Sequence, residues 1–189
     1  MERRAILQCV LVGAAVPWRA IAQSADGLWP LLQAGGQVVL VRHALTEPGV
    51  GDPPGFRLGA CGTQRNLSEQ GRADARRLGA VLRERRVPVA RVLSSPWCRC
   101  RETARLIFGR EGEVEPSLGN LFGRRELEAQ QVAELRKLVR RAEGGNLFMV
   151  THGSTTHALT GVSPGTGEMV VLTPQAGGGF RVAGRLAPD

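Results

Sequence analysis

Three short apolar runs have the length of buried strands, and each one ends at polar or charged side chains. They lie at residues 38–41, 91–93 and 147–150. The first run leads into Arg42 and His43, and the last leads through Thr151 into His152. The carboxyl ends of parallel strands meet at one edge of a sheet, so the two histidines are predicted to share a site.

Helical patterns lie between these runs. Ser68 is placed to cap a helix that continues to about Arg86, and apolar positions recur at helical spacing from about Glu126 to Ala142. Residues 94–96 turn the chain into a third helical stretch. Pro96 is expected in the first turn of this helix. We expect the apolar stripes of these helices to face the core.

The end of the chain has a different pattern. Residues 169–172 and 180–182 are typical of strands, and Pro174 and a glycine run between them predict an antiparallel hairpin. The fold class expected for residues 23–189 is a single three-layer α/β domain. It has a mostly parallel sheet, helices on both faces and the hairpin at its C-terminal end.

The composition and charge of the chain argue against nucleic acid as a partner. The 189 residues are 42% hydrophobic with a formal charge of +8, and 24 of the 25 basic residues are arginine. These arginines alternate with acidic residues and not with aromatic ones. Such a dispersed excess is typical of a solvated surface, so nucleic-acid binding is not expected.

Residues 1–22 resemble an export signal. Arg3 and Arg4 precede a short apolar segment, and small residues at Ala20 and Ala22 suit cleavage before Gln23. The twin-arginine and general secretory routes both remain open, as does an uncleaved form held at the membrane. The segment is too short for a permanent anchor, so the expected location is the periplasm, with no stable membrane insertion after signal removal.

The cysteines fit an oxidising compartment. Cys9 leaves with the signal, and Cys61 is expected to form a disulfide with Cys98 or Cys100. Residues two apart in a helix point in different directions, so Cys98 and Cys100 do not face one partner. The alternative is three buried thiols. A zinc site is disfavoured because no histidine has ligand spacing.

Arg42, His43, Arg99 and His152 are the candidates for one pocket. Phosphoryl transfer spreads negative charge over the phosphoryl oxygens, and arginine side chains match that geometry. Cations beside His43 favour its neutral form, which keeps a ring nitrogen available for attack. These residues can therefore serve a phosphoryl-transfer site.

Three motifs in this order resemble those of the histidine phosphatase superfamily. They are Arg42-His43-Ala44, the segment from Ser95 to Ala104, and Thr151-His152-Gly153, accompanied by Asn66-Leu67-Ser68-Glu69-Gln70-Gly71. The resemblance implies that His43 is the phosphorylated nucleophile and that Arg42, Arg99 and His152 bind the phosphoryl oxygens. It implies no metal and no other cofactor.

The general acid departs from the family pattern. Gly153 stands where phytase-like members have Asp, and Asn120 lies where mutase-like members have Glu. Glu126 is the nearest candidate acid, and Glu128 and Asp52 are weaker ones. Without a positioned acid, phosphohistidine, phosphoanhydrides and aryl phosphates are the substrates expected to react most readily, because their leaving groups need less protonation.

The expected function is a phosphatase that hydrolyses a phosphomonoester or similar small phosphoryl compound through a phosphohistidine intermediate. His157 matches no motif and is expected on a helix near the site, while Arg101 is expected at the surface. Two alternatives remain. One is a noncatalytic phosphate-binding envelope protein of the same fold, and the other is an envelope interaction protein that uses its basic surface.

Overall fold

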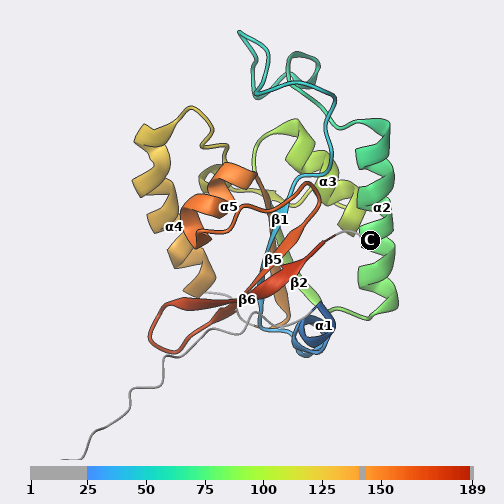
Figure 1. Cartoon of the computed structure of the whole chain (residues 1–189), viewed down its shortest axis with the longest axis vertical. Helices are drawn as coiled ribbons and strands as arrows, with labels where there is room; N and C mark the ends of the chain where they lie inside the picture. Colours follow the sequence, from blue (N-terminus) through green and yellow to red (C-terminus); the bar gives the residue numbers. More distant parts are fainter. Residues whose placement is uncertain (1–24, 141–143, 188–189) are drawn as a thin grey trace, which may run out of the picture.

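A mixed six-stranded sheet forms the centre of the computed structural model, which describes residues 25–140 and 144–187 (Figure 1). Its order is β3-β2-β4-β1-β5-β6. The strands are β1 (Val38–Arg42), β2 (Val89–Ser94), β3 (Glu113–Val114), β4 (Asn146–Thr151), β5 (Met169–Pro174) and β6 (Phe180–Leu186). Strands β1 to β4 run parallel to one another, β5 is antiparallel to β1, and β6 is antiparallel to β5, so the predicted fold class is confirmed. The predicted signal lies outside the described residues.

Helices cover both faces of the sheet. Val39 and Val41 face α1 (Ala25–Ala34), α2 (Glu69–Glu84) and α3 (Cys98–Phe108), whereas Val38 and Leu40 face α4 (Glu128–Arg140) and α5 (Gly153–Thr160). Successive side chains of a strand point to opposite faces, so one continuous apolar run supplies both halves of the core.

Two of the expected helices differ from the structure in detail. Residues 125–127 form a short 3-10 turn and α4 begins at Glu128, two residues after the expected start at about Glu126, while the expected end at about Ala142 lies outside the described residues. Pro96 lies before α3 and not in its first turn, because Trp97 is the N-cap. The start of α2 is as predicted, since the Ser68 hydroxyl accepts from Gly71 N at 3.1 Å.

The disulfide joins Cys61 to Cys98, which settles the choice that the sequence left open. Cys100 is a free, buried thiol, and its Sγ lies 3.6 Å from the carbonyl oxygen of Thr151. The bond ties the loop between β1 and α2 to the first residue of α3. It therefore fixes that loop beside the carboxyl ends of the central strands.

The strand ends assemble the site. β1 and β4 run side by side in parallel, with Arg42 in register with Thr151, so His43 and His152 follow at the same edge. No helix in the described ranges is long and apolar enough to cross a bilayer.

Candidate active site

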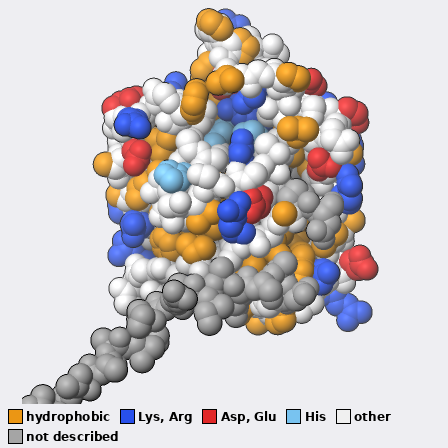
Figure 2. All heavy atoms as spheres, in the orientation of Figure 1, with side chains coloured by type: hydrophobic (Ala, Val, Ile, Leu, Met, Phe, Trp, Pro, Cys, Tyr) orange, Lys and Arg blue, Asp and Glu red, His pale blue; other side chains and the backbone are white. Residues whose placement is uncertain are grey.

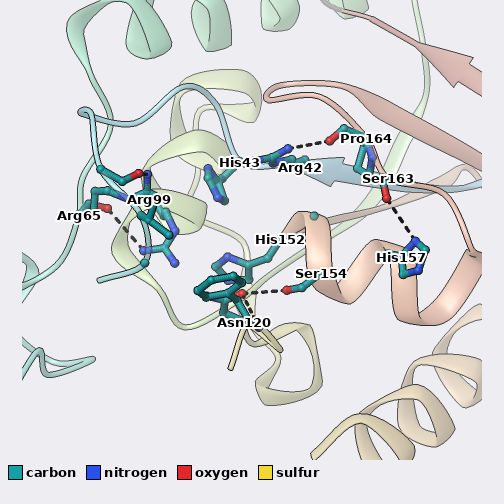
Figure 3. Close-up of a pocket in the computed structure, with 15 residues that line it drawn as sticks. Arg42, His43, Arg65, Arg99, Asn120, His152, Ser154, His157, Ser163 and Pro164 are labelled. Carbon is teal, nitrogen blue, oxygen red and sulfur yellow. Dashed lines mark hydrogen bonds between the residues drawn. The ribbon is translucent and has the colours of Figure 1, made fainter. Parts of the chain in front are cut away.

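A cavity of about 520 Å³ opens at the carboxyl ends of the parallel strands. All four candidates of the sequence motifs line it, namely Arg42, His43, Arg99 and His152. Figure 2 shows histidine atoms inside a hollow bordered by basic and hydrophobic side chains. Figure 3 shows His43 between Arg42 on one side and Arg65 with Arg99 on the other.

His43 is buried and has a fixed ring orientation. Its Nδ1 lies 2.9 Å from the carbonyl oxygen of Ala44, which can only accept, so Nδ1 carries the ring proton and Nε2 keeps its lone pair. Burial lowers the pKa of His43 to about 3; the bond to Ala44 opposes that change, and the charges of Arg99, Arg42 and Arg65 add to it. The ring is therefore neutral at physiological pH.

His152 is the N-cap residue of α5 and faces His43. The ring centroids of the two histidines are 5.4 Å apart. The Nε2 atom of His152 lies 2.8 Å from the hydroxyl of Ser95. Burial holds the pKa of His152 well below its usual value, and the charges of His43, Arg99 and Arg42 lower it further.

Arg99 forms a buried ion pair with Asp52. Nη1 and Nη2 of the guanidinium lie 2.6 and 3.2 Å from the two carboxylate oxygens, and the side chains are 1% and 3% exposed. Asp52 also accepts from the Trp97 indole and from Arg65 N, at 3.0 and 3.1 Å. Burial raises the pKa of Asp52, but these bonds and the charge of Arg99 outweigh burial and leave the pKa below its usual value.

Two further arginines complete the cationic lining. Arg42 donates from Nη1 to the carbonyl oxygen of Pro164 at 2.7 Å, and its guanidinium packs over Gly153. Arg65 donates to the carbonyl oxygen of Gly49. Sequence reasoning missed Arg65, although it directly precedes the Asn66–Gly71 motif.

Residues that line this cavity carry buried nitrogen atoms without hydrogen-bond partners. Five buried side-chain polar atoms have no hydrogen-bond partner within the described part of the chain, and four of them belong to residues that line the cavity. They are Nε of Arg42, Arg65 and Arg99, and Nδ1 of His152. Buried polar groups normally have partners, so this set fits a ligand rich in acceptor oxygens.

No Asp or Glu of residues 25–140 and 144–187 lines the cavity. Glu126 and Glu128, two of the acids considered from sequence, are exposed and line a neighbouring hollow. Asp52, the third, is held by Arg99. Asn120 does line the cavity, so the position noted from sequence presents an amide there. Within the described ranges, no three His, Cys, Asp or Glu side chains are grouped to hold a metal.

His157 and Arg101 lie farther from the two buried histidines. His157 is on α5, as expected, and lines the outer part of the cavity with its Nδ1 3.2 Å from the Ser163 hydroxyl. Arg101 pairs with Glu111 at the surface and does not line the cavity. The two residues match the places that the sequence predicted for them.

Comparison with solved structures gives the same fold. The protein histidine phosphatase SixA complexed with tungstate is 20% identical, with a TM-score of 0.58 over 80% of this chain and 97% of that one. A putative phosphohistidine phosphatase SixA from Agrobacterium tumefaciens is 25% identical, with a TM-score of 0.56 over 82% and 99%. A mycobacterial glucosyl-3-phosphoglycerate phosphatase is 19% identical, with a TM-score of 0.56 over 78% and 97%.

Sequence comparison agrees with the fold. Residues 38–120 match the family model described as histidine phosphatase superfamily (branch 1), a range that contains the first two arginine motifs. A comparison with curated protein sequences gave no match. The family match and the phosphatase neighbours support a hydrolase of this type. Residues 38–120 are therefore similar in sequence to the histidine phosphatase superfamily, and the fold is shared with solved phosphatases.

Proposed function

We propose that the protein is a phosphatase that hydrolyses a small phosphoryl compound through a phosphohistidine intermediate on His43. The observation that carries this proposal is that four residues with unpartnered buried nitrogen atoms line one cavity with a neutral histidine. A ligand without acceptor atoms would leave such donors unsatisfied, at a cost of about 1–3 kcal/mol for each one.

His43 supplies the nucleophile. Its Nε2 lone pair attacks phosphorus, the P–N bond forms, and the bond to the leaving group breaks with its electron pair. Water then attacks phosphorus, the P–N bond breaks, and the pair returns to Nε2 while the proton of water leaves with phosphate and solvent. The hydrogen bond from Nδ1 to Ala44 holds the ring in the required tautomer through both steps.

The cations stabilise the charge that spreads over the phosphoryl oxygens. Arg42, Arg65 and Arg99 approach from two sides of His43. A Ser95 hydroxyl that donates to Nε2 of His152 puts the ring proton of His152 on Nδ1. The Nδ1–H group then donates to a phosphoryl oxygen. His152 can therefore bind the phosphoryl group while its ring is neutral.

Turnover of p-nitrophenyl phosphate by the purified chain tests the proposal. We expect the wild type to release phosphate and to give an acid-labile phosphoenzyme after rapid quenching. The His43→Ala variant should show neither. Equal residual rates in the two proteins would overturn the enzymatic function.

A matched pair of arginine variants tests the binding site and the alternative function. Orthovanadate should raise the melting temperature of the wild type and of Arg101→Ala, but not of Arg99→Ala. Arg101 lies two residues farther along the same helix and outside the cavity. A vanadate shift without turnover in the wild type would favour the noncatalytic phosphate-binding protein.

Export to the periplasm is a further part of the proposal. The signal-like pattern of residues 1–22 and the Cys61–Cys98 disulfide both support it. Mass spectrometry of a periplasmic extract should find a mature chain that begins at Gln23. Recovery of the full-length chain in the cytoplasm alone would contradict it, and an Arg3→Lys, Arg4→Lys variant distinguishes the two routes.

A further inference from the structure

Two apolar side chains stand out at the mouth of the catalytic cavity. Val50 is 86% exposed and Phe122 is 62% exposed, the highest values for large hydrophobic residues in the described chain. Both line the same cavity as His43. Exposed apolar groups are common singly, but two on opposite loops at one cavity mark a surface that contacts a ligand.

Both loops are held by specific contacts. Phe122 follows the buried Leu121, whose N–H donates to the Ser154 hydroxyl at 3.2 Å. Val50 lies between Gly49, which accepts from Arg65, and the segment that carries Asp52. A Cβ placed on Gly51 would lie 3.9 Å from Cε1 of Phe122, so the two loops meet across the mouth.

Asn120 adds a polar group with a defined orientation. Its Oδ1 accepts from Phe122 N at 3.1 Å, and because a backbone N–H can only donate, this contact identifies the oxygen. The same oxygen lies 2.8 Å from the Ser154 hydroxyl. Nδ2 donates to no residue within the described ranges, and Asn120 lines the cavity, so the amide is free to donate to a ligand there.

None of the described residues that line the cavity supplies a carboxylic acid that could protonate a leaving group. Asp52 is engaged by Arg99, Trp97 and Arg65, and Glu126 lies in the neighbouring hollow. An amide donor stabilises developing charge on a leaving atom but cannot deliver a proton to it. Leaving groups that depart as stable anions are therefore the ones this cavity suits.

We propose that Val50, Phe122 and Asn120 form a subsite for the aromatic leaving group of an aryl phosphate. This inference rests on the proposed phosphatase function. The ring lies between the Val50 and Phe122 side chains, and the Asn120 amide donates to the oxygen that links the ring to phosphorus. When phosphorus transfers to Nε2 of His43, the P–O bond breaks and its electron pair leaves on the aryl oxygen as a phenolate, which water protonates later.

Binding of two non-hydrolysable phosphonates tests the subsite without any chemistry. Phenylphosphonate should bind the wild type about tenfold more tightly than methylphosphonate, because the ring contacts both apolar side chains. In Phe122→Ala that ratio should fall to about twofold. Val114→Ala removes an exposed apolar side chain of β3 outside the cavity and should keep the wild-type ratio. Equal affinities in the wild type, or an unchanged ratio in Phe122→Ala, would overturn the subsite.

Turnover supplies a second measurement. The wild type should hydrolyse 1-naphthyl phosphate with a lower KM than phenyl phosphate, and Phe122→Ala should raise the KM of the naphthyl ester most, because the larger ring has more area to lose. A higher KM for the naphthyl ester in the wild type would contradict the proposal.

The two proposals fail separately. If the wild type releases phosphate but binds both phosphonates equally, the phosphatase stands and the aromatic subsite is wrong. If the phosphonate ratio is as expected but the wild type and His43→Ala release phosphate at equal residual rates, the subsite stands as a ligand site and the phosphatase is wrong.

Discussion

At the scale of single residues, the carboxylate of Asp52 fixes the orientation of the Arg99 side chain. It accepts from both terminal nitrogens of the guanidinium, and the pair is almost fully buried. Breaking a buried pair from one side leaves an uncompensated charge, which costs more than the pair itself contributes. Arg99 therefore depends on Asp52 for its conformation in the absence of a bound anion.

Asp52→Asn should lower the free energy of unfolding by about 3 kcal/mol. Orthovanadate should then raise the melting temperature of the variant more than that of the wild type, because the anion supplies the missing negative charge. Chemical denaturation with and without vanadate measures both effects.

The matched control is Glu111→Gln. It breaks the half-exposed ion pair between Glu111 and Arg101, and Arg101 lies on α3 like Arg99. Exposed pairs contribute about 0–1 kcal/mol, so this variant should be close to the wild type in stability. Equal stability of Asp52→Asn and Glu111→Gln would show that the buried pair is not needed.

At the scale of elements, the first turn of α2 packs directly against the backbone of the segment that follows β1. Gly71 in the first turn of α2 touches the backbone of Leu45, two residues after His43. A Cβ at position 71 would lie 2.0 Å from the carbonyl oxygen of Leu45. The glycine of the Asn66–Gly71 motif is therefore required by contact between two segments of backbone.

Gly71→Ala should destabilise the protein by about 2–3 kcal/mol, because backbone has to move to admit the methyl group. The movement is next to His43, so turnover should fall as well. Gly59→Ala is the control, since a Cβ there meets no atom within 4 Å. Urea denaturation of both variants decides the point, and similar midpoints would contradict the close contact.

The Cys61–Cys98 disulfide joins the loop that carries Asp52 and Arg65 to α3. The sequence separation of the two cysteines is 37, and a closed loop of that size gives about 4 kcal/mol in the chain-entropy model. The double variant Cys61→Ser, Cys98→Ser should lose about 2–4 kcal/mol of stability. Dithiothreitol should destabilise the wild type and leave the double variant unchanged; an equal response in both would contradict this role.

Stability of the whole molecule should depend on pH through its two buried histidines. The pKa of His43 is lowered by burial to about 3, and the pKa of His152 is also lowered. Above about pH 6.5 these rings are neutral in both the folded and unfolded states. As the pH falls from about 6.5 towards 3, only the unfolded chain takes up these protons, so the folded state loses stability.

The loss should approach about 1.4 kcal/mol per pH unit for each histidine. Urea unfolding at pH 7, 5.5 and 4.5 measures it. His43→Gln removes one of the two titrating groups, so its stability should fall less steeply than that of the wild type. Parallel curves for the two proteins would contradict a buried, neutral His43.

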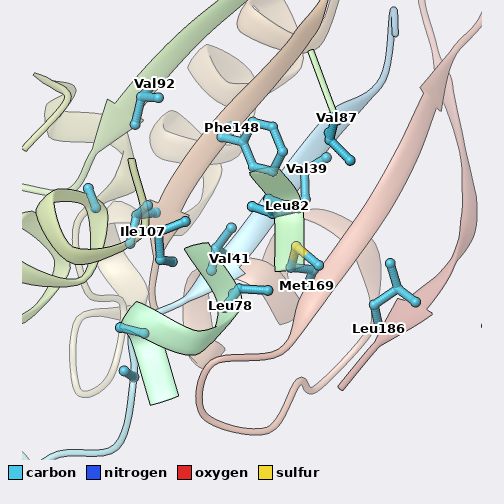
Figure 4. Close-up of a cluster of buried hydrophobic side chains, with 14 of the residues drawn as sticks. Val39, Val41, Leu78, Leu82, Val87, Val92, Ile107, Phe148, Met169 and Leu186 are labelled. Carbon is cyan, nitrogen blue, oxygen red and sulfur yellow. The ribbon is translucent and has the colours of Figure 1, made fainter. Parts of the chain in front are cut away.

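Local patterns in the sequence determined much of the architecture. Strand-length apolar runs, the Ser68 cap and the hairpin signals depend on neighbouring residues, so five strands and helices α2 to α4 followed from them, whereas α1, β3 and the order of the strands did not. Figure 4 shows the result, with side chains from β1, α2 and β4 meeting in one apolar cluster. The polar residues that follow the apolar runs also identified Arg42, His43 and His152 as candidates for one site.

Long-range contacts were decided only by the tertiary structure. Asp52 meets Arg99 across 47 residues, and Cys61 meets Cys98 rather than Cys100, because a loop without periodicity folds over α3. The same loop brings Arg65 into the cavity, while Glu126 lies in the neighbouring hollow. Periodicity reports which face of an element is buried, but a loop follows pairings that form only when the whole chain is folded.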